Sequence, residues 1–268
     1  MQVLRRSLSP GVTLTPQGGC AFACHETHPS SDNLGNPGGE DNYQLARNLG
    51  VTLRIDLLGE AAQSLMATAK TTEQSTTASY QMAIYTFDES FNTIQTITAN
   101  LTNAENAAAT VGLLTVYSNN WLTSTNDNSD ADTNYDSAMQ SLNSIMPNPG
   151  SGTNNKGDTP QEVVFLVTDG VEDELVGSNR QQSVMNTAWC TTIKNRGIRI
   201  AVLYTEYLPL PTNSWYNTYI SPIQNNIAPT LESCASPGLY FEVDTGGDIS
   251  AALADLFQSA VESAYLAK

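Results

Sequence analysis

The stretch EVVFLVTDG at residues 162–170 decides the fold class. It is a continuous apolar run that stops at an acid, Asp169, followed by Gly170. Such runs are typical of parallel strands whose two faces are both covered by helices. In open α/β sheets the binding crevice lies at the carboxyl ends of the strands, so Asp169 is a candidate binding residue. Its carboxylate can take a hard cation or simply cap the turn into Gly170, and position alone favours the cap.

Strands and helices alternate on both sides of this stretch. We expect further strands at residues 79–87, 91–98, 198–205 and 238–243, and helices at residues 45–69, 102–114, 135–146, 179–196, 215–234 and 249–264. This order predicts an α/β fold with a mostly parallel central sheet and helices on both faces. Residues 1–41 are punctuated by Gly, Pro, Ser and Asn and predict an irregular segment, so residues 42–268 form the single folded domain.

The charge of the chain excludes some classes of partner. Lys and Arg number 11 against 27 Asp and Glu, giving a net charge of -16. Such a chain repels nucleic-acid backbones and anionic lipids, so we expect neither nucleic acid nor direct membrane contact. No run approaches the ~18 apolar residues of a spanning helix, and the first residues lack the apolar region of a signal peptide. An even cysteine count and scarce Lys favour an extracytoplasmic protein.

A second acidic segment, NDNSDADTNYDSAM at residues 126–139, precedes a predicted helix. An EF-hand loop starting at Asn126 would need Gly at its sixth position and Glu at its twelfth. The chain has Ala131 and Ser137 there, so the motif fails. What remains is Thr133 at a helix start, close to two aspartates.

Several motifs together resemble a von Willebrand factor A domain, and more narrowly the TadG-like proteins of the Flp (tight adherence) pilus-assembly system. The motifs that carry the resemblance are GCAFACH, LGVTLRIDLL, YTFDES, DTNYDSAM, VTDGVEDE, AWC, IAVLYTEYLP and SPGLYFEV, which span nearly the whole chain. The resemblance implies a Rossmann-like three-layer sandwich and a role in adhesion or pilus assembly rather than catalysis.

The same resemblance implies a metal ion-dependent adhesion site. The family's metal ligands come from an Asp-x-Ser-x-Ser loop after the first strand, a Thr from a second loop and an Asp from a third. Thr133 matches that Thr and Asp169 matches that Asp, whereas the first loop has no match before residue 20. We therefore expect the first strand and the family's N-terminal transmembrane anchor to be missing from this chain, and Mg²⁺ or Mn²⁺ to bind only weakly.

The loop GCAFACHETH holds Cys20, Cys24, His25 and His28. A c-type haem normally attaches at Cys-x-x-Cys-His, and here three residues separate the cysteines. The four side chains could also bind Zn²⁺, although the usual knuckle spacing is absent. In an oxidising compartment a Cys20–Cys24 disulfide is the simplest outcome, and free thiols are a further possibility.

The other two cysteines, Cys190 and Cys234, lie in predicted helices that flank the strand at residues 198–205. Consecutive crossovers could bring them together, and a disulfide needs Cα atoms within roughly 7 Å. Two separate buried thiols are the alternative, because free cysteine is often buried.

The leading hypothesis is a non-catalytic module of the bacterial cell envelope that binds a protein partner of the pilus machinery, with help from a divalent cation. The alternative is a c-type cytochrome-like electron carrier with haem on Cys20, Cys24 and His25. A hydrolase has little support, because both histidines lie in one loop and no Gly-x-Ser-x-Gly is present.

Overall fold

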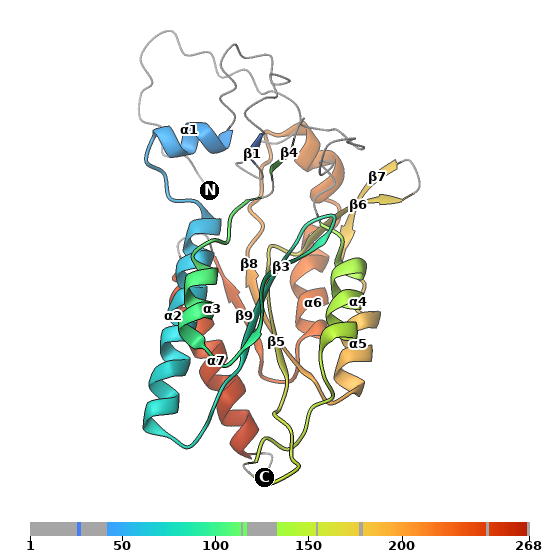
Figure 1. Cartoon of the computed structure of the whole chain (residues 1–268). Helices are drawn as coiled ribbons and strands as arrows, with labels where there is room; N and C mark the ends of the chain where they lie inside the picture. Colours follow the sequence, from blue (N-terminus) through green and yellow to red (C-terminus); the bar gives the residue numbers. More distant parts are fainter. Residues whose placement is uncertain are drawn as a thin grey trace.

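A computed structural model describes residues 26–27, 42–113, 115–116, 133–153, 155–176, 179–244 and 247–266. Strands run through the middle of the molecule, with helices on both sides of them (Figure 1). The prediction of an α/β fold with helices on both faces is confirmed. Among the described helices, none combines the length and the apolar character that crossing a membrane requires.

The main sheet is parallel and has the strand order β5 (Val163–Thr168), β8 (Arg199–Thr205), β9 (Tyr240–Val243). β8 is its middle strand and pairs with both neighbours. Five of the seven residues of β8 are buried, because strands flank it on two sides and helices cover both faces. This strand is the centre of the hydrophobic core.

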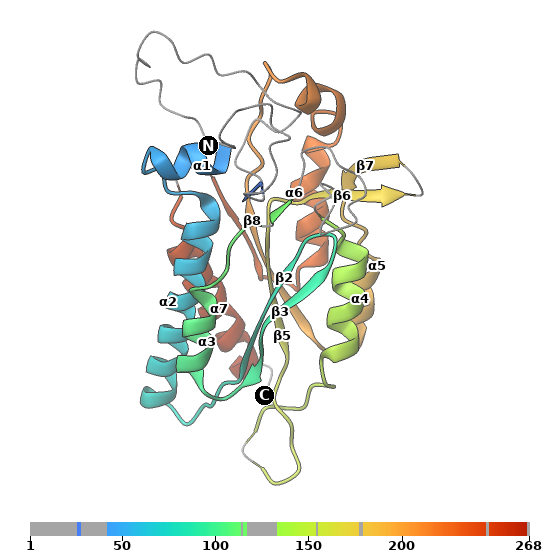
Figure 2. The same cartoon turned by 45° about the horizontal axis from the view of Figure 1, so that its top comes forward.

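Three further strand pairs surround the main sheet. β2 (Met82–Phe87) and β3 (Phe91–Thr98) form one antiparallel hairpin, and β6 (Val171–Val176) and β7 (Asn179–Val184) form another. β1 (Glu26–Thr27) pairs in parallel with β4 (Thr115–Val116). The β6–β7 hairpin projects away from the sheet beside α4 and α6 (Figure 2).

The helices form two layers. One layer contains α2 (Arg54–Ser75), α3 (Leu101–Ala108) and α7 (Ile249–Leu266), and the other contains α4 (Tyr135–Ile145), α5 (Ala188–Asn195) and α6 (Gln224–Cys234). α1 (Asn42–Asn48) precedes α2, and the short π-helix η1 (Tyr216–Ile220) precedes α6. Each layer buries its own apolar cluster against the strands.

Four of the predicted helices were wrong in extent or type. The helix expected at 102–114 ends at Ala108, and Ala109 is its C-cap. Residues 179–184 belong to β7, because their backbone pairs with β6, and the helix begins only at Ala188. The helix expected at 45–69 divides at Gly50, whose φ of 65° is a left-handed conformation. The helix expected at 215–234 divides after η1, where Pro222 has no N–H to continue it.

Candidate functional site

The carboxyl end of β5 places Asp169 at the edge of the sheet. Gly170 follows it with a φ of 81°, and an added Cβ would lie 2.3 Å from Ile227 Cγ2, so only glycine fits this turn. The Val171 N–H donates to Asp169 Oδ1 at 3.3 Å. Asp169 thus caps the turn through one oxygen, while its side chain stays exposed to solvent.

Two opposing effects act on the carboxyl of Asp169. Desolvation by the surrounding protein raises its pKa, whereas the Val171 amide and the positive charge of Arg54 lower it. Arg54 is the first residue of α2, and its guanidinium donates to the backbone carbonyls of Thr205 at 3.4 Å and Glu206 at 2.8 Å. A crowded but exposed carboxylate is placed to receive a cation or a basic side chain.

Thr133 lies at the same edge because a short bridge fixes it to the segment that follows Asp169. Its N–H donates to the Asp173 carbonyl at 2.9 Å, and the Asp173 N–H donates to the Thr133 carbonyl at 3.0 Å. Two residues later, the hydroxyl of Tyr135 hydrogen-bonds to Thr168 Oγ1. The start of α4 and the end of β5 are therefore held together, and the two residues matched to the family site share one edge.

Two acids in β6 are buried behind this edge. Glu172 is 4% exposed and accepts hydrogen bonds from the Tyr135 N–H at 3.2 Å and the Ser183 hydroxyl at 3.1 Å. Desolvation raises the pKa of Glu172, and the nearby charges of Glu174 and Asp136 raise it further. The other buried acid, Asp173, forms an ion pair with Arg180. These two acids are therefore shielded from solvent, unlike Asp169.

The end of β2 contributes a further carboxylate. Asp88 comes directly after β2, and its carbonyl accepts the Asn134 N–H at 2.9 Å, next to Thr133. Partial burial raises the pKa of Asp88, although hydrogen bonds from the Ser90 amide and the Asn92 side chain lower it. Two strands, β2 and β5, thus end in an acid at the same edge of the molecule.

Sequence reasoning missed Arg54, Tyr135 and Glu172. A signal for Arg54 was present, because an arginine at a helix N-terminus opposes the helix dipole and needs carbonyl acceptors elsewhere. Tyr135 and Glu172 gave no such signal, since their roles depend on contacts with segments more than thirty residues away.

Two of the described residues at this edge carry oxygen atoms that could bind a cation. Thr133 and Asp169 offer a hydroxyl and a carboxylate, which are oxygen ligands suited to Mg²⁺ or Mn²⁺. Within the described ranges, no group of three His, Cys, Asp or Glu side chains could hold a metal ion. Mg²⁺ requires six oxygens in near-octahedral geometry, so these two residues do not by themselves make a complete site.

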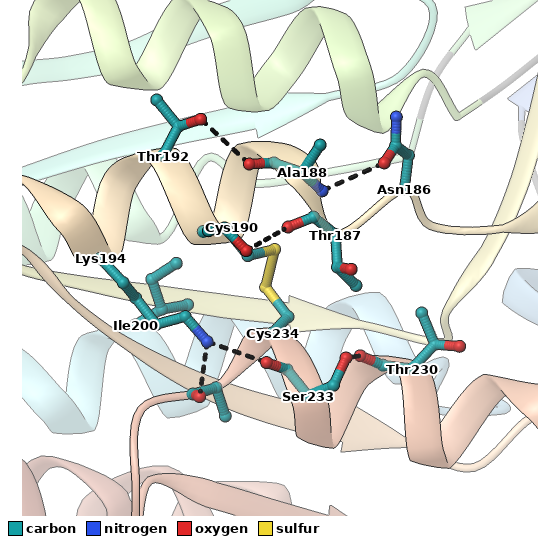
Figure 3. Close-up of a disulfide and its surroundings, with 12 residues drawn as sticks. Asn186, Thr187, Ala188, Cys190, Thr192, Lys194, Ile200, Thr230, Ser233 and Cys234 are labelled. Carbon is teal, nitrogen blue, oxygen red and sulfur yellow. Dashed lines mark hydrogen bonds between the residues drawn. A yellow bond between two sulfur atoms is a disulfide. The ribbon is translucent and has the colours of Figure 1, made fainter.

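Of the cysteines, Cys190 and Cys234 are joined by a disulfide, with Cα atoms 5.2 Å apart (Figure 3). Both are completely buried, and the bond ties α5 to α6. Lys194 reinforces this link by donating to the carbonyls of Ser233 at 2.8 Å and Ala235 at 3.2 Å. The predictions for the loop of Cys20, Cys24, His25 and His28, whether disulfide, Zn²⁺ or haem, lie outside the described residues.

Comparison with known proteins gives matches only at the level of structure. No protein-family model and no curated protein matches this chain. The von Willebrand factor domain of the type V pili tip protein Mfa5 from Porphyromonas gingivalis superposes with a TM-score of 0.51 at 8% identity, over 83% of this chain and 91% of that one. The fold is that of a von Willebrand factor A domain.

Two other solved structures are more distant. BatB from Bacteroides thetaiotaomicron has a TM-score of 0.43 at 13% identity, covering 78% of this chain and 89% of that protein. The pilus adhesin SpaC from Lactobacillus rhamnosus GG has a TM-score of 0.46 at 9% identity. That match covers 77% of this chain and 28% of SpaC. In this fold, Asp169 and Thr133 lie at the carboxyl edge where α/β sheets bind ligands.

Proposed function

We propose that this chain is a non-catalytic adhesion or assembly module of the bacterial cell envelope that binds a protein partner at the carboxyl edge of its sheet. The observation that carries the proposal is the acidic edge, where Asp88 and Asp169 follow the ends of β2 and β5. Two carboxylates at one edge of a chain with net charge -16 attract a basic surface and speed its encounter.

The pilus system is the context that the sequence motifs support best. The TadG-like motifs point to Flp pilus assembly, and a protein of the same fold, Mfa5, is described as a pilus tip protein. The likeness to Mfa5 is one of fold and is used here as an analogy. A buried Cys190–Cys234 disulfide favours an oxidising compartment, so we place the module in the periplasm or at the cell surface.

A divalent cation is a candidate aid to this binding. Thr133 and Asp169 would provide two ligand oxygens for Mg²⁺ or Mn²⁺, and the partner and water would provide the others. The turn at Gly170 and the Val171 amide would hold the Asp169 carboxylate in position for the cation.

An adherence assay tests the proposal. The gene is deleted in its host and complemented with the wild type, with the edge variant Asp88→Ala/Asp169→Ala, or with Glu232→Ala. Glu232 is exposed near the end of α6, at the opposite edge of the sheet, and serves as the matched control. We expect wild type and control to restore adherence and the edge variant to restore little. Full restoration by the edge variant, or unchanged adherence after deletion, would reject the proposal.

A further inference from the structure

A groove separates β3 from α4 on the surface of the molecule. The Asn134 N–H donates to the Asp88 carbonyl at 2.9 Å, so the turn before β3 and the start of α4 are joined. From this joint the β2–β3 hairpin and the helix run down the molecule and move apart, as Figure 2 shows. The groove between them has a volume of about 690 Å³, which is within the range of small-molecule sites in proteins.

One side of α4 forms a wall of this groove. The wall residues are Gln140, Ser141, Ser144 and Ile145. They recur at spacings of three and four, so they lie together on one side of the helix. The other side of α4 packs into the hydrophobic core, whereas Ile145 is 49% exposed. The packing of the fold therefore leaves this side of α4 accessible to a ligand.

An irregular part of β3 forms the opposite wall. The pairing register between β3 and β2 shifts on both sides of Ile84, so β3 bulges there. In a regular strand, consecutive side chains point to opposite faces. Thr96 and Ile97 nevertheless both line the groove, and Ile97 is 58% exposed. Bulges re-aim side chains in this way and are frequent next to functional sites.

The groove is built from uncharged parts of an acidic chain. Residues 90–104 and 137–155 contain no Asp, Glu, Lys, Arg or His, although the whole chain has 27 acids and 11 bases. These two stretches and Tyr85 supply every residue that lines the groove. A site without ionised groups does not compensate for the desolvation of a charged ligand, so the ligand that fits it is neutral.

Several neutral polar groups in the groove are available to a ligand. Within the described part of the chain, the hydroxyls of Thr93, Thr96 and Ser141 and the amide side chain of Gln140 bond to no other protein group. The Ser144 hydroxyl donates to the Gln140 carbonyl at 2.9 Å and can still accept a hydrogen bond. Hydroxyl and amide groups both donate and accept, so they match a ligand with several hydroxyls.

Apolar surface lies beside these polar groups. The rings of Tyr85 and Phe91 stack with their centroids 4.8 Å apart, and both partly exposed residues line the groove. Aromatic rings offer a flat apolar surface, to which other flat apolar surfaces bind well. A pyranose ring is such a surface, because its C–H groups form an apolar face while its hydroxyls surround the rim.

We propose that the groove between β3 and α4 binds a neutral oligosaccharide made of hexose units. The C–H face of one sugar packs against the ring of Tyr85 or Phe91, and the sugar hydroxyls bond to Thr93, Gln140 and Ser141. The groove contains none of the carboxylates of the acidic edge. The sugar site therefore stands or falls independently of the proposed binding of a protein partner at that edge.

Other occupants fit the groove less well. A phosphate or carboxylate finds no cation among the lining residues, and a basic peptide finds no carboxylate. A purely apolar ligand would cover the hydroxyls and the Gln140 amide without replacing their hydrogen bonds to water, which is unfavourable. A partner strand that pairs with β3 needs a regular edge, and the bulges near Ile84 remove that regularity.

Nuclear magnetic resonance on the full chain tests the site with named sugars. The neutral probes are maltotriose, cellotriose and mannotriose, and the control is trigalacturonic acid, whose units carry carboxylates. We expect at least one neutral trisaccharide, at about 20 mM, to shift the signals of the Thr93 and Ser141 backbone amides and of the Gln140 side-chain amide. The acidic trisaccharide should shift none of them.

A matched pair of variants locates the binding. Gln140→Ala/Ser144→Ala should raise the dissociation constant about fivefold or more, because at least one hydrogen bond to the sugar is lost. Ser64→Ala/Thr68→Ala on α2 removes a pair with the same spacing, in which the Thr68 hydroxyl donates to the Ser64 carbonyl at 3.0 Å, and should leave the constant unchanged. Circular dichroism checks that both variants fold.

Three results would overturn the sugar site. The first is the absence of any shift with the three neutral trisaccharides, and the second is equal binding of the acidic one. The third is an unchanged dissociation constant in Gln140→Ala/Ser144→Ala. In each case, a defect of the Asp88→Ala/Asp169→Ala variant in the adherence assay would leave the adhesion role standing.

Discussion

The strands β8 and β2 show what a neighbour contributes to burial. Their sequences, RIAVLYT and MAIYTF, are similarly apolar. Five of seven residues are buried in β8, which has a strand on each side, whereas none of six is buried in β2, which pairs on one side among the described residues. Apolar sequence makes a strand suitable for a core, but flanking strands and helices decide whether it is enclosed.

The region around β8 is also cross-linked. The Cys190–Cys234 disulfide and the Lys194 hydrogen bonds join α5 to α6 on one face of the sheet. Beside β2, the ion pair between Lys70 and Glu105 joins α2 to α3 at partly exposed positions. Such pairs are worth little, so we expect the β8 region to be the more stable one.

The largest expected effect is on the core of the β8 region. Leu203→Ala removes a completely buried side chain and should lower the free energy of unfolding by about 3–4 kcal/mol. Ile84→Ala in β2 removes a similar volume from a half-exposed site and should lower it by only about 1 kcal/mol. Urea unfolding measures both, and equal losses would show that the two regions do not differ as described.

Removing the disulfide should have the next largest effect. The variant Cys190→Ala/Cys234→Ala should lose about 2–4 kcal/mol of stability, chiefly because the unfolded chain gains freedom. Chemical unfolding without reductant measures the loss. Cys20→Ala/Cys24→Ala is the matched control, and a greater loss from that control would place the important cross-link elsewhere.

The turn at Gly170 connects the acidic edge to the β8 region. Gly170→Ala should lower the free energy of unfolding by about 2–3 kcal/mol. The left-handed φ at this position strains alanine, and the new Cβ would clash with Ile227 and Leu231. Gly238 also has a left-handed φ, of 76°, but a Cβ added there would meet no atom within 4 Å. Gly238→Ala should therefore lower the free energy of unfolding by only about 1 kcal/mol. Thermal unfolding compares the two, and similar losses would mean that the packing at Gly170 relaxes.

A smaller effect concerns pH. The folded state raises the pKa of Glu172 above its ordinary value of 4.5, so folding disfavours its ionised form. Stability should therefore rise as the pH falls from 7 through the folded pKa, and stop rising below the unfolded pKa. Glu172→Gln should be about 1 kcal/mol more stable than wild type at pH 7 and lose that advantage near pH 4. A stability difference between Glu172→Gln and wild type that stays the same from pH 7 to pH 4 would contradict the cause given.

The smallest expected effect is cation binding by the chain alone. Titration calorimetry with Mg²⁺ and Mn²⁺ should give dissociation constants above about 1 mM, because Thr133 and Asp169 supply two ligands of six. Sub-millimolar binding that disappears in Asp169→Ala would show that the edge between the two regions holds a more complete site.

Much of the architecture could be read from local patterns. The run at 162–170 predicted a buried parallel strand that ends in an acid, and β5 followed by Asp169 is what the structure contains. Residues 179–184 suggested a helix because their sequence, NRQQSV, is polar and shows no apolar alternation typical of a strand. Their pairing with β6 depends on another segment of the chain. The start of α3 was predicted at Thr102, whereas Asn100 caps it, since both residues can accept from the first amides.

The site was predictable only in part, because some of its residues meet only through contacts between distant segments of the chain. Thr133 and Asp169 were identified through motifs, which record position along the chain. Arg54 reaches residues about 150 positions away, and Glu172 meets Tyr135 across 37 positions. The resemblance predicted a missing strand, and among the described residues β2 and β5 do not pair with each other.

The Cys190–Cys234 bond has a mechanical consequence. The two residues are 44 positions apart, and the loop they close contains all of β8. Tension applied to the two ends of the chain would pass through the sulfur atoms and bypass the loop. About 150 Å of extensible chain thus stays out of reach of a pulling force until the bond is reduced. The central strand of the sheet is shielded from stretching even when the segments outside the loop give way.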